Sequence, residues 1–115
     1  MTISPLPQDH NRRASPRKVI RRAATVLVGD ASREVQTWDL GRDGMSLLAQ
    51  RPIAPGTRCR IVFDVPIGGE LFAVSAAAKV VYSSYSAAGE FKIGAVFLDL
   101  DDTAAGALDR FAAAS

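Results

Sequence analysis

The stretch TRCRIVFDV, residues 57–65, decides the fold class of this chain, because its side chains alternate in character. The small or apolar positions are Thr57, Cys59, Ile61, Phe63 and Val65. Charged side chains stand at most of the positions between them. Successive side chains of a β-strand point to opposite faces, so this period of two predicts a strand with one buried face.

Further strands are predicted on both sides of this stretch. They cover residues 23–28, 33–40, 45–49, 71–82 and 90–98, and segments with turn-forming residues separate them. We expect residues 83–89 to form a loop. Short strands at this spacing predict an all-β sandwich or small barrel.

The end of the chain changes period and predicts a helix over roughly residues 103–113. Ala104, Leu108 and Phe111 lie at i, i+4 and i+7, on one face of that helix. Asp101 or Asp102 can cap its first turn. We expect this helix to close one end of the strand assembly.

The length and composition of the chain predict one domain with a buried core. The chain has 115 residues, 48% of them hydrophobic, and its first residues are polar and proline-rich rather than a secretory leader. No apolar run approaches the ~20 residues that a membrane helix needs, so we expect no membrane insertion. The single cysteine, Cys59, suits a reducing compartment, which predicts a cytoplasmic protein.

The positive charge is concentrated near the beginning of the chain. Residues 1–22 hold six basic residues and one acidic residue, a net charge of +5. The remaining residues hold eight basic and 11 acidic side chains, a net charge of −3. The basic segment should therefore attract an anion, such as a nucleotide, a nucleic acid or a lipid surface.

Catalysis and metal binding find little support in the sequence. The only histidine, His10, lies in a predicted tail, and one histidine with one cysteine cannot fill a zinc site. Arg58 and Arg60 could favour a thiolate at Cys59, but the alternation predicts that this side chain points inward as a small hydrophobe. We therefore expect no catalytic residues, no metal and no enzymatic activity.

Two short motifs remain as candidates for function. Arg13-Ala-Ser-Pro-Arg17, preceded by Arg12, offers planar guanidinium groups that suit phosphate oxygens and the O6/N7 edge of guanine. Asp39-Leu-Gly-Arg-Asp-Gly44 offers a carboxylate for the paired N1 and N2 donors of guanine and glycines for a close backbone approach. Taken alone, each motif has a better explanation without function, a solvated basic tail for the first and an ordinary hairpin turn for the second.

Together the two motifs resemble the signature of the PilZ domain family, R-x-x-x-R followed by [D/N]-x-S-x-x-G. The resemblance covers roughly residues 12–112 and includes the strand from Phe91 to Phe97. It implies a six-stranded antiparallel β-barrel with a C-terminal helix. The implied organisation is a flexible tail over residues 1–11 and one PilZ-type domain over 12–115, with a basic arm at 12–22, the barrel at 23–98 and the helix at 101–114.

The resemblance also implies a function, a non-enzymatic receptor for cyclic di-GMP that needs no cofactor. By carry-over the ligand-binding residues are Arg12, Arg13, Arg17, Asp39, Gly41 and Gly44. The family acts in motility, exopolysaccharide synthesis and biofilm formation, through an effector protein that the sequence does not identify. We expect residues 1–18 to be mobile without ligand and to become ordered when it binds.

One position departs from the signature, because Gly41 stands where the family has serine. A hydroxyl that contacts the ligand is therefore missing, and some PilZ-like domains without ligand serve as protein-binding modules. Such a degenerate module is the alternative to a receptor. Nucleic-acid binding is disfavoured by the acidic body and the few aromatic residues. Trp38 is expected to pack in the core, because alternation places it opposite Asp39.

Overall fold

We describe residues 17–113 of the chain in a computed structural model. It contains seven strands and one helix: β1 (Arg17–Val19), β2 (Ala23–Val28), β3 (Ala31–Gly41), β4 (Gly44–Ala49), β5 (Arg58–Ile67), β6 (Glu70–Ala87), β7 (Glu90–Asp99) and α2 (Asp102–Ala113). The predicted all-β class with a C-terminal helix is confirmed.

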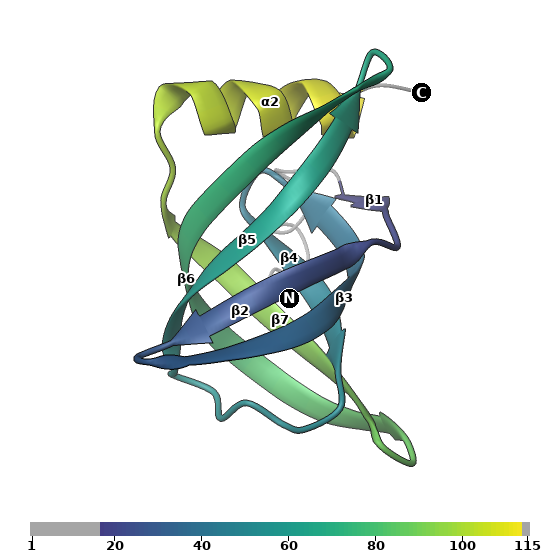
Figure 1. The fold of residues 1–115 in the computed structure, drawn as a ribbon, viewed down its shortest axis with the longest axis vertical. Helices are drawn as coiled ribbons and strands as arrows, with labels where there is room; N and C mark the ends of the chain where they lie inside the picture. Colours follow the sequence, from purple (N-terminus) through teal and green to yellow (C-terminus); the bar gives the residue numbers. More distant parts are fainter. Residues whose placement is uncertain (1–16, 114–115) are drawn as a thin grey trace, which may run out of the picture.

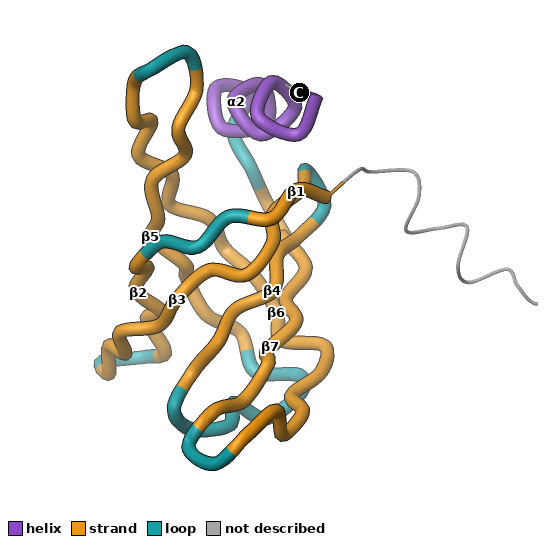
Figure 2. Tube along the Cα trace, turned by 90° about the vertical axis from the view of Figure 1, so that its right-hand side faces the viewer, coloured by secondary structure: helices purple, strands orange, loops and turns teal. Residues whose placement is uncertain are grey.

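Six of the strands close on themselves. Each strand pairs antiparallel with its neighbours in the order β3, β2, β5, β6, β7 and β4, and β4 pairs again with β3. The short β1 adds to β3 beyond the end of β2. The helix α2 lies across one end of this ring (Figures 1 and 2).

The core fills the inside of the ring, as the alternation in β5 predicts. Ile61, Phe63 and Val65 are buried, while the residues between them are exposed. Cys59 is partly buried against the same core, so the prediction that it points inward is confirmed.

The helix α2 begins and packs as its sequence predicts. The Oδ1 atom of Asp101 accepts a hydrogen bond of 2.7 Å from the backbone N–H of Ala104, which identifies Asp101 as the cap. Leu108 and Phe111 are buried in the core, and Ala104 packs against it. No helix in residues 17–113 is long and apolar enough to cross a membrane.

The loop predicted over residues 83–89 is wrong, because β6 continues to Ala87 and turns at Ala88 and Gly89. The segment from Ser83 to Ala87 pairs with the first residues of β7. Backbone hydrogen bonds of a two-stranded hairpin need no apolar alternation, so a polar, serine-rich sequence can form it. Gly89 has a φ of 71°, which this tight turn requires.

Candidate functional site

The two sequence motifs meet where β1 pairs with the end of β3. In this register Arg17 lies opposite Gly41, and Val19 lies opposite Asp39. The Nη1 atom of Arg17 lies 2.9 Å from Oδ1 of Asp39, a charge-assisted hydrogen bond. The structure thus joins one residue of each motif across 22 positions of sequence. Arg12 and Arg13 lie outside the described residues.

The last residues of the basic segment have partners in the fold. Arg17 and Lys18 belong to the strand β1. Arg17 contacts Asp39, and Lys18 donates a hydrogen bond to the carbonyl oxygen of Phe111. The expectation that residues 1–18 are mobile without ligand and become ordered on binding stays a prediction.

A buried hydroxyl holds the chain in place between β1 and β2. Thr37 is 1% exposed, and its Oγ1 donates to the carbonyl oxygen of Ile20 at 2.6 Å. The Oγ1 atom of Thr37 also accepts a hydrogen bond of 2.9 Å from the backbone N–H of Arg22. The Thr37 hydroxyl thus bridges the residues on either side of Arg21, which is exposed.

Trp38 does not pack in the core, so the prediction for it is wrong. The register between β3 and β4 shifts between Thr37 and Asp39, which makes Trp38 an extra residue, a β-bulge. Thr37 and Leu40 on either side are buried. The bulge therefore places Trp38 and Asp39 together on the outer face, where both are half-buried.

Cations surround the ring of Trp38. The guanidinium carbon of Arg21 lies 3.8 Å from the centroid of the ring, and the Nζ atom of Lys92 lies 5.4 Å from it. Both distances are typical of cation–π contacts. Alternation in the sequence could not reveal this cluster, because the bulge that creates it breaks the alternation.

The glycines of the second motif do not serve as left-handed turn residues. Neither Gly41 nor Gly44 has a positive φ. Gly44 is needed because β4 approaches β7 closely there. A Cβ atom at this position would clash with the carbonyl oxygen of Ala95 and lie 3.1 Å from Cα of Val96. Gly41 is buried at the end of β3.

Two hydroxyl groups near Asp39 were not expected, that of Tyr82, which is 39% exposed, and that of Ser46, which is buried. Ser46 pairs with Asp39 across β3 and β4, and its Oγ lies 3.2 Å from the hydroxyl oxygen of Tyr82. A second register shift, between Val80 and Tyr82, allows the tyrosine ring to lie over Gly94. The outer face beside Asp39 therefore combines carboxylate, hydroxyl, aromatic and cationic groups.

Neither a reactive thiol nor a metal centre emerges from the described part of the chain. Burial raises the pKa of the Cys59 thiol, which outweighs any effect of its arginine neighbours in the sequence. Residues 17–113 contain no group of three or more potential metal ligands.

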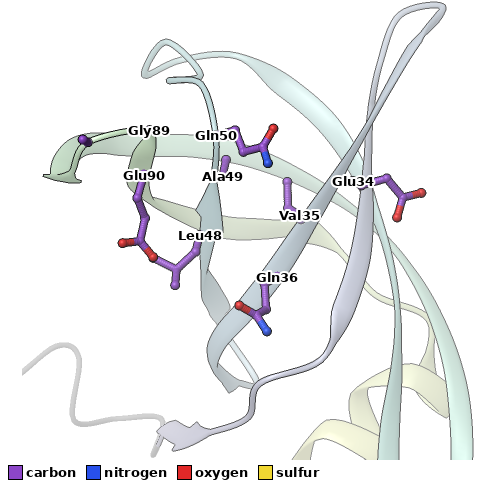
Figure 3. A pocket seen from close by; sticks show the side chains of 9 residues that line it. Glu34, Val35, Gln36, Leu48, Ala49, Gln50, Gly89 and Glu90 are labelled. Atoms are coloured by element: carbon purple, nitrogen blue, oxygen red, sulfur yellow. The ribbon is translucent and has the colours of Figure 1, made fainter.

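A pocket of about 410 Å³ lies away from these residues, where β3 and β4 separate beside the β6–β7 turn (Figure 3). Glu34, Gln36, Gln50 and Glu90 supply its polar lining. Two of its lining residues, Gln36 and Leu48, form the last pair between β3 and β4, at the end of these strands far from Gly41 and Gly44. The pocket therefore contains none of the motif residues that the structure describes.

Comparison with known proteins agrees with the PilZ resemblance of the two sequence motifs. In solved structures, the chain is similar to the Bacillus subtilis inhibitor of motility MotI/DgrA, with a TM-score of 0.77 and 12% identity over 88% of this chain and 49% of that one. It is also similar to the Borreliella burgdorferi PlzA protein in complex with c-di-GMP, with a TM-score of 0.60 and 15% identity over 95% of this chain and 50% of that one.

The chain thus spans about half the length of these two structures, and at such identities the likeness concerns the fold. No curated protein sequence matches it. The family model described as the PilZ domain matches residues 11–114, nearly the whole chain. Together with the meeting of the two motifs on one face, this match shows that the chain belongs to the PilZ domain family.

Proposed function

We propose that this protein is a receptor for cyclic di-GMP that binds the ligand on the outer face of β1 and β3. The observation that carries the proposal is the contact between Arg17 and Asp39, because it unites a phosphate-binding and a guanine-binding group. PlzA, a structural neighbour, is described in complex with c-di-GMP. The ligand-binding residues would be Arg12, Arg13, Arg17 and Asp39, with Gly41 and Gly44 on either side of the β3–β4 turn.

Binding would exchange partners rather than create unpaired charges. Asp39 would leave Arg17 and accept hydrogen bonds from N1 and N2 of a guanine, while Arg17 would turn to a phosphate. The side chains of Arg17 and Asp39 are 38% and 23% exposed. Because exposed ion pairs contribute only about 0–1 kcal/mol, breaking this pair opposes binding weakly.

The missing hydroxyl at Gly41 is the main argument for the alternative, a PilZ-like module that binds a protein partner and no nucleotide. One neutral hydrogen bond contributes about 0.5–1.5 kcal/mol, which corresponds to a roughly 2–13-fold loss of affinity. The charge-assisted contacts of the arginines are stronger, so we expect weakened rather than abolished binding. Gly41→Ser should accordingly tighten binding by roughly 2–13-fold.

We further propose that the receptor acts on an effector protein by ordering the segment before β1 against β3. Such ordering costs conformational entropy and presents a new surface. Amide exchange in residues 10–20 should slow when ligand is added. Unchanged exchange with binding established would exclude this mode of signalling. The proposal includes neither a catalytic step nor a cofactor, and it assigns the protein to the cytoplasm.

Isothermal titration of the full chain with cyclic di-GMP tests the proposal. The native protein should bind at micromolar concentration or better, and Arg13→Ala/Arg17→Ala should not bind. A matched control is Arg58→Ala/Arg60→Ala, which removes two exposed arginines from β5 and leaves both motifs intact. It should bind like the native protein.

The alternative predicts a different pattern. Absence of binding by the native chain, with binding restored by Gly41→Ser, would identify a degenerate site and favour the protein-binding module. Equal losses in the two double variants would show that the arginine motif acts only through net charge.

A further inference from the structure

Arg21 lies outside both sequence motifs, yet its side chain is held in a defined place. Its guanidinium carbon lies 3.8 Å from the centroid of the Trp38 ring, at stacking distance. The residue is exposed, and within residues 17–113 no carboxylate forms an ion pair with it. A guanidinium that stacks through its face keeps the N–H donors of its edge available to a ligand.

The backbone places Arg21 on the same face as the proposed site. Arg17, Val19 and Arg21 are exposed, whereas Ile20 between them is buried in the core. Val19 lies opposite Asp39 in the register of β1 and β3. Asp39 therefore lies between two arginines that project from one edge, and the bulge at Trp38 supplies the surface on which the second arginine rests.

We infer that Arg21 is a further ligand-binding arginine, beyond those of the motif, and that it donates two hydrogen bonds to O6 and N7 of the guanine whose N1 and N2 contact Asp39. The inference rests on the proposed function. Along the edge of guanine the donors N2 and N1 are followed by the acceptors O6 and N7. A carboxylate beside a guanidinium complements that order of groups. Trp38 is a positioning residue, because it holds the guanidinium in place without being required to touch the ligand.

The order of groups also predicts which base is rejected. Adenine presents an amino donor where guanine presents O6. Arg21 would then face a donor with its own donors, and the bidentate contact would be lost. Arg21 and Asp39 together would select guanine over adenine.

The test compares Arg21→Ala with Arg22→Ala by isothermal titration with cyclic di-GMP. Both residues are exposed and carry the same charge, but only Arg21 stacks on Trp38. We expect Arg21→Ala to weaken binding at least about 10-fold and Arg22→Ala to change it less than about 2-fold. A ligand carrying 7-deazaguanine lacks N7, so it should bind the native protein more weakly than cyclic di-GMP does. Arg21→Ala, which has already lost the contact with N7, should bind the two ligands equally well.

Trp38 has its own readouts, because it is the only tryptophan of the chain. Its fluorescence should change when Arg21 is replaced, even without ligand. Trp38→Leu should weaken binding, and Trp38→Phe, which keeps an aromatic face, should restore most of the affinity.

The outcomes separate this inference from the function on which it rests. Binding by the native chain with equal affinities of Arg21→Ala and Arg22→Ala would overturn the inference and leave the receptor intact. If replacing N7 in the ligand lowered the affinity of the native protein and of Arg21→Ala by the same factor, the assignment of Arg21 to the guanine edge would be wrong. Absence of binding by the native chain would overturn both proposals.

Discussion

At Gly44 the backbone of β4 lies so close to that of β7 that no side chain fits. The atoms that a Cβ would meet belong to the backbone of Ala95 and Val96, inside a closed ring of strands. Gly94 is also crowded, but the atoms around it are those of the Tyr82 ring, which is 39% exposed. A methyl group at Gly44 would therefore have to displace backbone atoms, whereas one at Gly94 would have to displace only a side chain.

This difference predicts losses of unequal size for the same substitution at the two glycines. Gly44→Ala should lower the free energy of unfolding by roughly 3 kcal/mol, since backbone must shift to accommodate the methyl group. Gly94→Ala should cost about 1 kcal/mol, because Tyr82 can swing outward and lose only its hydrogen bond to Ser46. Urea denaturation of both variants measures the two values. Equal losses would show that β4 and β7 can separate easily at Gly44.

The thiol of Cys59 predicts a pH dependence of stability. Burial raises its pKa in the folded protein above its ordinary value of 9.0. Between the two pKa values the unfolded chain has lost the proton that the folded chain retains, so stability falls as the pH rises through this window. The free energy of unfolding should decrease more between pH 8 and 10 for the native protein than for Cys59→Ala. Parallel profiles of the two proteins would contradict this assignment.

At the scale of elements, one buried hydroxyl group bridges the break between β1 and β2, beside backbone hydrogen bonds from Ile20 to Trp38 and from Thr37 to Arg22. Thr37 is buried and bridges Ile20 and Arg22. Thr37→Val preserves the shape of the side chain but leaves two backbone groups without their partner. We expect a loss of about 1–3 kcal/mol in the free energy of unfolding, and weaker binding of cyclic di-GMP because Arg21 is no longer held in place.

Thr37→Ser provides the control for this prediction, since it retains the hydroxyl and removes only a methyl group. It should keep the affinity of the native protein, as measured by isothermal titration. If Thr37→Val also kept that affinity, the bridge would be structural only and would not position Arg21.

The elements themselves could be predicted from the sequence, whereas their irregularities could not. The alternation in residues 57–65 and the helical spacing of Leu108 and Phe111 follow directly from the periods of strand and helix. A bulge has no such signal, because it results from pairing between strands. For that reason Asp39 was predicted to face outward and Trp38 was wrongly expected to face inward.

The candidate site shows the same division. Arg17 and Asp39 could be selected from motif spacing, and the structure brings them into contact. Arg21, Ser46, Lys92 and Tyr82 belong to no motif. Arg21 contacts Trp38 because the segment between β1 and β2 is tied to β3, whereas the other three are brought to this part of the sheet by the pairing of β3, β4, β7 and β6. Proximity of this kind depends on the register of strands that are distant in sequence.

At the scale of the whole molecule, the closed ring separates a buried apolar core from an outer face. The helix α2 contacts β1 and the second motif. Lys18 of β1 donates a hydrogen bond to the carbonyl oxygen of Phe111, and Nη1 of Arg42 in the β3–β4 turn lies 3.5 Å from Oδ2 of Asp109. The proposed ligand face, the added strand β1 and the helix therefore form one continuous set of contacts on a stable scaffold.

The distribution of charge predicts how salt distinguishes a dinucleotide receptor from a nucleic-acid-binding protein. Residues 1–22 carry a net charge of +5 on a body of −3. If about five of these cations neutralised phosphates of a nucleic acid, counterion release would reduce affinity by roughly 10²–10³-fold between 50 and 200 mM salt. A cyclic dinucleotide has only two phosphates and binds partly through base edges, so we expect its affinity to fall less than about 10-fold. Titrations at the two salt concentrations measure this ratio, and a steep fall for the dinucleotide would mean that the arginines attract charge without recognising guanine.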